Sequence, residues 1–137
     1  MVIDTNAPFG GRVAQRLQSE QVGWIVTVNA DGTPEPSPVW FYWDGRELLV
    51  RSQPTAKLRN IRRNPRVAFH FNSDAEGDDV VVLLGTARIA ERSRAPLDEA
   101  YLEKYADAIK GLGSDPERFA ASYSEEVLIT PTKVRGH

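Results

Sequence analysis

The chain has 137 residues, of which 41% are hydrophobic and 26% are charged, and its formal net charge is -2 at pH 7. This length and balance predict one soluble globular domain over residues 1–137, and they exclude a disordered tail or a fibrous repeat. The absence of cysteine excludes a disulfide framework, a thiolate metal site and a cysteine nucleophile. The small net charge gives no general attraction to nucleic acid or to an anionic membrane.

No apolar run in the sequence approaches the roughly 20 residues that cross a bilayer. The N-terminus lacks the basic-then-apolar order of a signal peptide. We therefore expect a cytoplasmic protein that does not enter a membrane.

The N-terminal third predicts a short helix followed by three antiparallel strands. Residues 12–20 place Val13, Ala14 and Leu17 at helical spacing, and we expect this helix to cover one end of a barrel. Asp31-Gly32 predicts a two-residue hairpin between the first two strands, and a second Asp-Gly pair precedes the third. The predicted strands span residues 22–29, 34–43 and 47–52.

The middle of the chain predicts a helix between two further strands. The helix covers residues 55–63, with Leu58 and Ile61 facing inward, and ends before Asn64-Pro65. Residues 66–71 alternate, which places Val67, Phe69 and Phe71 on one face of a strand. Residues 80–90 form a long β-branched run, and Gly85 within it marks a bulge or a bend.

The C-terminal third predicts two helices and a last strand. Residues 96–109 carry apolar side chains at helical spacing, and Asp115-Pro116 opens a second short helix. The last strand spans residues 126–130. Together the elements predict an α+β fold, a six-stranded antiparallel barrel with peripheral helices. The apolar positions of the longer helix are Leu97, Tyr101, Leu102, Tyr105 and Ile109.

Basic side chains are concentrated between Glu47 and Asp74, where no acidic residue occurs. Such a cluster fits an anionic ligand, because positive side chains beside the free N–H groups of a helix end bind phosphate or carboxylate. The alternative is a solvated helix face with no ligand. The basic residues are Arg51, Lys57, Arg59, Arg62, Arg63 and Arg66.

The junction of strand and helix within this cluster favours the anion. Ser52 ends the strand, Pro54 stops its pairing, and Thr55 takes the N-cap position of the helix. Lys57 then lies in the first turn, where the helix macrodipole is already positive. A bound phosphate would offset that repulsion. The alternative is an ordinary threonine cap beside an exposed lysine.

An aromatic strand, residues 37–43, lies one hairpin away from this junction. Alternation predicts Trp40 and Tyr42 on one face, with Val39, Phe41 and Trp43 on the other. Such a strand provides an apolar wall for a flat redox ring. The alternative is that these side chains only form the barrel core and a dimer interface.

Taken together, these motifs resemble a known family. The sequence Pro36-Ser-Pro-Val-Trp-Phe41, Ser52, Thr55-Ala-Lys57 and residues 59–67 is similar to the pyridoxamine 5'-phosphate oxidase-like split β-barrels. Within them it most resembles the small F420 (deazaflavin)-dependent reductases of the flavin/deazaflavin oxidoreductase B group. The resemblance covers about residues 24–90.

The resemblance implies an FMN-binding type of split barrel, a homodimer with cofactor sites at the interface, and a small-molecule substrate. Members that bind FMN often have a second basic residue before the lysine, where this chain has Ala56, so F420 is preferred and FMN is the alternative. The implied cofactor-binding residues are Ser37, Pro38, Val39, Trp40, Arg51, Ser52, Thr55, Ala56 and Lys57.

The expected reaction is hydride transfer from reduced F420 (F420H2) to a conjugated small molecule. The cofactor supplies this reactivity, so we predict no catalytic side chain and no metal site, with any proton coming from solvent or a tyrosine. His70 is expected on the wet side of its strand. The alternatives are an FMN-dependent oxidoreductase and a non-enzymatic module that binds a cofactor, haem or nucleic acid. A pI near 5.7 disfavours nucleic acid.

Overall fold

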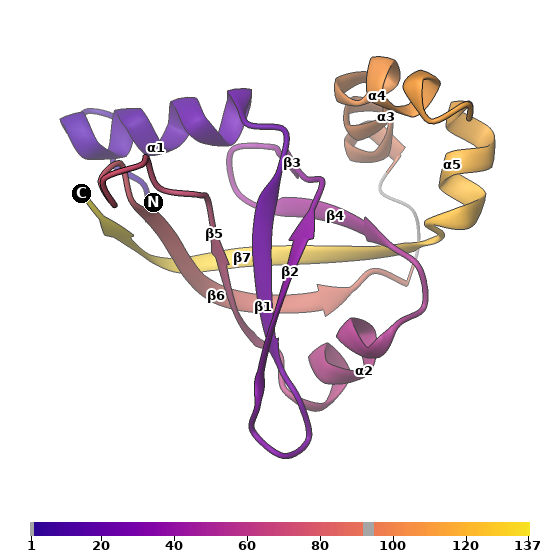
Figure 1. Cartoon of the computed structure of the whole chain (residues 1–137), viewed down its shortest axis with the longest axis horizontal. Coiled ribbons are helices and arrows are strands. Elements are labelled where there is room, and N and C mark those ends of the chain that lie inside the picture. Colours follow the sequence, from indigo (N-terminus) through magenta and orange to yellow (C-terminus); the bar gives the residue numbers. More distant parts are fainter. Residues whose placement is uncertain (1, 92–94) are drawn as a thin grey trace.

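The computed structural model describes residues 2–91 and 95–137, and within them a curled antiparallel sheet carries helices around its rim (Figure 1). The strands are β1 (Gly23–Val28), β2 (Pro34–Val39), β3 (Tyr42–Trp43), β4 (Leu48–Ser52), β5 (Arg66–His70), β6 (Val81–Ile89) and β7 (Glu125–Gly136). The helices are α1 (Pro8–Ser19), α2 (Ala56–Arg63), α3 (Ala95–Lys104), α4 (Ala106–Gly111) and α5 (Pro116–Ser122).

The strand order explains why the sheet closes. It is β2-β1-β5-β6-β7-β4-β3, so β2 and β3 form opposite edges. In the chain only Trp40 and Phe41 separate these two strands, and the edges must therefore come together. The predicted split β-barrel is confirmed. Its strand count is seven instead of six, because the strand expected at residues 34–43 turns at Trp40 to pair with β1 before the turn and with β4 after it.

The barrel interior holds the larger core cluster. Phe41, Phe69 and Phe71 meet there with ring centroids 5.1–5.6 Å apart. Leu58 and Ile61 of α2 belong to the same cluster, as do Val13 and Leu17 of α1. The alternation predicted for residues 66–71 is confirmed, because Val67, Phe69 and Phe71 are all buried.

Helix α1 begins at Pro8, four residues earlier than the predicted start at Arg12. Proline at the first helical position has the helical φ and lacks an N–H that would have no partner there. Gly10 packs against the preceding segment so closely that a Cβ atom would lie 1.8 Å from the Asp4 carbonyl oxygen. The sequence did not indicate this earlier start, because glycine has a low helix propensity and Gly10 and Gly11 both lie in the first turn.

The hairpin between β1 and β2 is longer than predicted. The last pair is Val28 with Pro34, and the N–H of Asn29 donates to the carbonyl of Thr33 at 2.8 Å. Gly32 adopts a φ of +89°, the left-handed conformation that closes a three-residue loop. The two-residue prediction is wrong, because Gly32 is the third loop residue.

The helix predicted over residues 96–109 is two helices that meet at Tyr105. Tyr105 leaves the helical geometry with a φ of -104° and a ψ of 12°, and it is the N-cap of α4. Tyr101, Tyr105 and Ile109 are buried as expected, and the side chain of Leu97 lies outside the described residues. The short helix after Asp115 is confirmed as α5, and its N-cap carboxylate accepts from the Arg118 N–H.

Strand β7 continues to Gly136, beyond the predicted end at Thr130. Pro131 does not end it, because the register with β6 shifts beside Gly85 and the proline lies at that irregularity. A Cβ atom on Gly85 would lie 2.2 Å from the Thr130 carbonyl oxygen. The irregularity predicted at Gly85, a bulge or a bend, is therefore confirmed, and its unpaired residue is Thr132 on the neighbouring strand β7.

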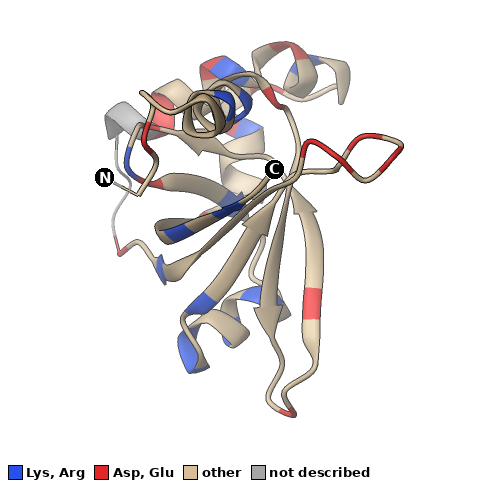
Figure 2. Cartoon of the chain, turned by 90° about the vertical axis from the view of Figure 1, so that its left-hand side faces the viewer, with Lys and Arg blue, Asp and Glu red and all other residues tan. Residues whose placement is uncertain are grey.

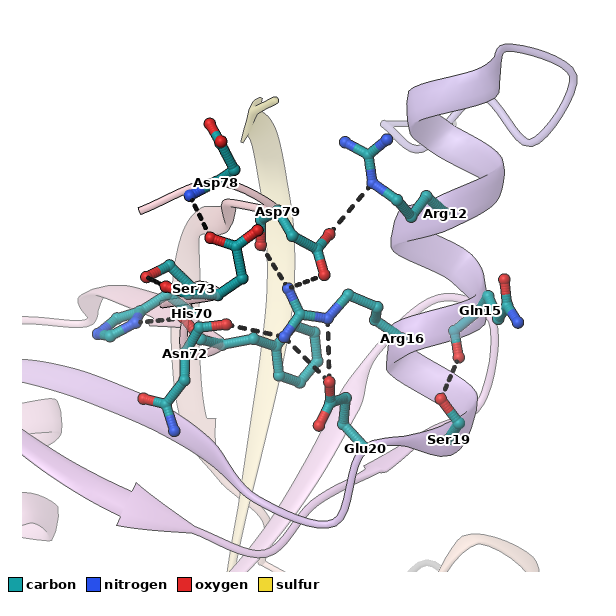
Figure 3. A network of polar contacts seen from close by, with 12 residues as sticks. Arg12, Gln15, Arg16, Ser19, Glu20, His70, Asn72, Ser73, Asp78 and Asp79 are labelled. Carbon is teal, nitrogen blue, oxygen red and sulfur yellow. Dashed lines mark hydrogen bonds and ion pairs between the residues drawn. The ribbon is translucent and has the colours of Figure 1, made fainter. Parts of the chain in front are cut away.

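An arginine network ties α1 to the acidic turn before β6, which Figure 2 shows as a loop carrying acidic residues. Arg16 donates to the carbonyls of Asp79 (2.6 Å) and Asn72 (2.9 Å). It also pairs with Glu20 at 2.9 Å, as Figure 3 shows. Its guanidinium lies 4.9 Å from the centroid of the Phe71 ring. The network holds one end of the barrel closed.

Candidate cofactor-binding site

A cleft of about 420 Å³ opens where β2 and β4 end and α2 begins, and residues of α3 and α5 with Leu112, which follows α4, complete its wall. It is polar at the α2 end and aromatic on the opposite wall, and among the described residues none that lines it is acidic. The lining residues are Val22, Pro38, Val39, Trp40, Arg51, Ser52, Gln53, Thr55, Lys57, Tyr101, Leu112, Phe119 and Tyr123.

Seven of the nine residues predicted to bind the cofactor line this cleft, and Ser37 and Ala56 do not. Ser37 pairs with Ile25 in the register of β1 and β2, so it shares the face of a core residue. Ala56 is exposed on α2. The seven are Pro38, Val39, Trp40, Arg51, Ser52, Thr55 and Lys57.

The polar end contains a cation with no carboxylate partner in the described part of the chain. Lys57 is half-buried in the first turn of α2, and burial lowers the pKa of its ammonium. Thr55 takes the N-cap position as predicted, but its hydroxyl does not cap the helix. The Ser52 hydroxyl donates to the Gln53 carbonyl at 2.8 Å. This donor set fits a phosphate group.

The aromatic wall is built on Trp40. Its ring stacks on Tyr105 with centroids 4.6 Å apart and an interplanar angle of 1°. On Phe119 the separation is 5.5 Å and the angle is 20°. Phe119 in turn stacks on Tyr123 at 4.6 Å. Trp40 and Tyr42 lie on the outer face, and Val39, Phe41 and Trp43 join the interior, as the alternation predicted.

The turn between β2 and β3 is fixed by two neighbouring residues of the helical region. The Phe41 N–H donates to the Tyr105 hydroxyl at 2.8 Å. The Lys104 ammonium donates to the Phe41 carbonyl at 2.8 Å and lies 3.7 Å from the centroid of the Phe41 ring. Burial lowers the pKa of Lys104 to about 8, and the nearby charge of Glu20 opposes that shift. These contacts hold Trp40 in the cleft wall.

Arg51 lines the cleft, but its guanidinium is bound by the protein. It pairs with Asp98 of α3 and with Glu126 of β7. It also donates to the carbonyls of Ala120 and Tyr123, each at 3.0 Å. The side chain is only 5% exposed. The predicted cofactor ligand therefore joins strand β4 to the helices that cover the cleft.

The contribution of the late helices to the cleft was not predicted. Tyr101 is one of the apolar positions of the longer predicted helix and Phe119 follows the predicted helix start at Asp115-Pro116, yet nothing in the sequence placed them beside Trp40. Leu112 and Tyr123 are exposed, so no burial pattern marks them. The lining residues that were missed are Val22, Gln53, Tyr101, Leu112, Phe119 and Tyr123.

The two histidines of the chain, His70 and His137, do not line this cleft. In residues 2–91 and 95–137 there is no group of three or more His, Cys, Asp or Glu that could hold a metal ion. Over the same ranges, no helix has the length and apolar content to span a bilayer.

Comparison with known proteins agrees with this fold. A family model described as pyridoxamine 5'-phosphate oxidase matches residues 9–137. A solved structure described as an F420 reductase is 28% identical, with a TM-score of 0.66 and coverage of 88% of this chain and 94% of that chain.

Two more distant structures show the fold alone. A conserved hypothetical protein from Mycobacterium tuberculosis is 23% identical, with a TM-score of 0.72 and coverage of 91% of this chain and 81% of that chain. HutZ, described as the haem storage protein of Vibrio cholerae, is 18% identical, with a TM-score of 0.70 and coverage of 99% and 95%.

Proposed function

Since the chain belongs to the pyridoxamine 5'-phosphate oxidase family, as its motifs predicted, we propose that it is an F420-dependent oxidoreductase that reduces a conjugated small molecule. The observation that carries this proposal is the half-buried Lys57, which faces the cleft at the start of α2 with no carboxylate partner in the described residues. A phosphate bound there supplies the missing negative charge and uses the positive end of the helix.

Different residues of the cleft bind different parts of the cofactor. Lys57, with the hydroxyls of Ser52 and Thr55, binds the phosphate at the polar end. Val39 and Trp40 form the apolar wall against which a ring system lies. The late helices exclude water from the opposite side. The reduced cofactor, when bound, supplies the hydride, so the protein's own task is to bind, orient and dehydrate.

Two observations favour F420 over FMN. Ala56 stands where a second basic residue is often found in FMN-binding relatives. Arg59, Arg62 and Arg66 are exposed and have no ion-pair partner in the described part of the chain, so they suit the polyglutamate tail of the deazaflavin. The similarity to a structure described as an F420 reductase supports the same choice. FMN on the same barrel is the second candidate.

Titration of the purified protein with F420 and with FMN tests the proposal. We expect F420 to bind more tightly, and Lys57→Ala to weaken that binding by about 1–3 kcal/mol, the cost of losing a charge-assisted hydrogen bond. Lys110→Ala is the matched control, because Lys110 is an exposed lysine of α4 that does not line the cleft. Unchanged affinity in Lys57→Ala would place the phosphate elsewhere, and tighter binding of FMN would reverse the choice of cofactor.

Haem is disfavoured by the donor set of the cleft. Haem iron in proteins takes axial ligands from His, Cys, Met or Tyr. In residues 2–91 and 95–137 no His, Cys or Met lines the cleft, and of the two tyrosines that do, Tyr101 is only 1% exposed. Titration with haemin therefore serves as the negative arm of the same experiment, and a stoichiometric Soret shift abolished by Tyr123→Phe would instead support a haem-binding module.

The proposal includes a homodimer formed through the outer face of β1, β2, β5 and β6. No helix crosses in front of β1 and β2 in Figure 1. The register places two rows of mostly apolar, partly exposed side chains on this face. Pro38 belongs to one row and also lines the cleft, so a partner there reaches the cleft mouth. The rows are Pro38, Trp24, His70 and Val82, and Pro36, Val26, Ala68 and Leu84.

Sedimentation equilibrium tests this dimer. The wild-type protein is expected at twice the 15.3 kDa chain mass, and Val26→Lys at the monomer mass, because a buried unpaired ammonium opposes association. Asp107→Lys on the exposed side of α4 controls for the added charge. A dimer that persists in Val26→Lys would rule out this face.

A further inference from the structure

Three of the four large hydrophobic side chains that are exposed in the described part of the chain lie at the cleft. Large hydrophobic residues that are exposed in the described chain are Val2, Val22, Leu112 and Tyr123. All of them except Val2 line the cleft. Exposed apolar groups gathered at one concave site indicate a surface that is covered when a ligand binds.

Tyr123 is the end of the aromatic stack that begins at Trp40. Its ring lies on Phe119 with centroids 4.6 Å apart and an interplanar angle of 22°. Phe119 is the only ring that it contacts in residues 2–91 and 95–137. The side chain remains 36% exposed and lines the cleft. The stack can therefore be continued by one more flat ring, supplied by a ligand.

Arg51 fixes the place of Tyr123. Its Nε donates to the Tyr123 carbonyl, and its Nη2 donates to the Ala120 carbonyl within α5, both at 3.0 Å. Asp98 and Glu126 orient the guanidinium from the other side. Since Arg51 is next to Ser52 in β4, one strand positions both the phosphate end of the cleft and the end of its aromatic wall.

We propose that Tyr123 determines acceptor specificity by stacking on a flat, uncharged conjugated ring, and that Arg51 is a positioning residue that acts through Tyr123 and does not bind the cofactor. Among the residues that the structure describes, no acidic side chain lines the cleft, so a cationic acceptor finds no counter-charge there. The proposal deepens the proposed function, on which its catalytic part rests. In that reaction the acceptor gains a hydride from the reduced cofactor and a proton from solvent, which is a two-electron reduction.

Binding of 2-methyl-1,4-naphthoquinone to the cofactor-free protein tests the role of Tyr123 without any turnover. Quenching of tryptophan fluorescence reports its Kd, because Trp40 lies in the same wall. We expect Tyr123→Leu to raise the Kd about threefold to tenfold, the equivalent of one stacking contact. Tyr123→Phe should restore binding. The non-aromatic 2-cyclohexen-1-one should show little difference between the variants, and equal quinone affinity in Tyr123→Leu would overturn the role of Tyr123.

A double-mutant cycle tests the role of Arg51. Arg51→Lys keeps a positive charge near Asp98 and Glu126 but cannot form the same set of hydrogen bonds. We expect it to raise the quinone Kd in the native background, to add nothing in the Tyr123→Leu background, and to leave the Kd for F420 unchanged. With the loaded enzyme, the acceptor KM should rise while kcat changes less.

The outcomes separate this proposal from the proposed function. If Arg51→Lys weakens F420 binding in both backgrounds, Arg51 is a cofactor ligand and its positioning role is wrong. If the wild-type protein binds neither F420 nor FMN, the proposed function fails, while the quinone titration still decides the role of Tyr123. Circular dichroism of Arg51→Lys checks that its fold is intact. If Arg51→Lys does not fold, the Tyr123→Leu variant still tests the stacking.

Discussion

Two arginines, Arg16 and Arg51, are surrounded by nearly the same set of groups at opposite parts of the barrel. Each pairs with two carboxylates and donates to two backbone carbonyls from distant segments. They differ in burial. The carboxylate partners of Arg16 are 39% and 41% exposed, whereas those of Arg51 are 19% and 6% exposed.

This difference in burial gives the two arginine networks different roles. Arg16 ties a helix to an acidic turn (Figure 3), and neither Arg16 nor its partners line the cleft. Its contribution is therefore to stability, and solvation of its carboxylate partners reduces that contribution. Arg51 joins a strand to the cleft wall in a nearly dry environment, where each lost partner leaves an unsatisfied charge. Arg51 therefore contributes both to stability and to the shape of the site, whereas Arg16 contributes to stability alone.

The substitution Arg51→Met is expected to have the largest effect on the free energy of unfolding. Removing the guanidinium leaves two carboxylates that are mostly buried and two carbonyls without their donor, so we expect the free energy of unfolding to fall by about 3–5 kcal/mol. Urea denaturation followed by circular dichroism measures this loss. A loss below about 1 kcal/mol would mean that burial around Arg51 is not the decisive difference between the two networks.

Arg16→Met should cost less, about 1–2 kcal/mol in the same urea titration, because its carboxylates can be solvated when the arginine is lost. Binding of F420 and of the naphthoquinone should be unchanged in this variant, since α1 contributes nothing to the cleft lining. An altered quinone affinity in Arg16→Met would show that the Arg16 network is coupled to the cleft and would contradict the separate roles of the two arginines.

Salt should act on the two networks unequally. At 1 M NaCl the screening length falls to about 3 Å, and the half-exposed pairs of Arg16 feel this more than the buried pairs of Arg51. The difference in unfolding free energy between wild type and Arg16→Met should therefore shrink between 0.1 M and 1 M NaCl, while that for Arg51→Met changes little. Equal changes in both would contradict the assigned difference in solvation.

A pH dependence of stability is expected at Lys104, which lies near Glu20 of the Arg16 network. In the folded protein its pKa is about 8, below the ordinary value of 10.5. Between those values the unfolded chain binds a proton that the folded chain has released, so the contribution of Lys104 to stability rises with pH across this window. Urea titrations of wild type and Lys104→Met at pH 7.5 and pH 10 measure this contribution. The free energy of unfolding of the wild type, relative to that of Lys104→Met, should be higher at pH 10 than at pH 7.5.

Local patterns in the sequence were sufficient for much of the fold and for the polar end of the site. The alternation of residues 66–71 placed three buried side chains correctly, and Pro54 with Thr55 marked the start of α2. Local patterns could not predict that the barrel closes at Trp40 and Phe41. It depends on one short segment pairing with β1 before the turn and with β4 after it, and these two pairings lie at opposite edges of the sheet.

The role of Arg51 illustrates why part of the site was out of reach. Its partners lie 47 to 75 residues away in the sequence, and neither charge nor spacing indicates them. In the sequence Arg51 is one of a run of basic residues, all of which suit an anion. Only the packing of α3 and α5 against β4 separates it from Lys57, which keeps its ammonium available in the cleft.

The central claim is that the cleft binds the phosphate of a flavin-like cofactor at Lys57, and a crystal structure of the protein with F420 tests it most directly. We predict phosphate density within hydrogen-bonding distance of the Lys57 ammonium and the Ser52 or Thr55 hydroxyl, with the ring system against Trp40. Phosphate density on the outer arginines of α2, with the ring system outside the cleft, would contradict it.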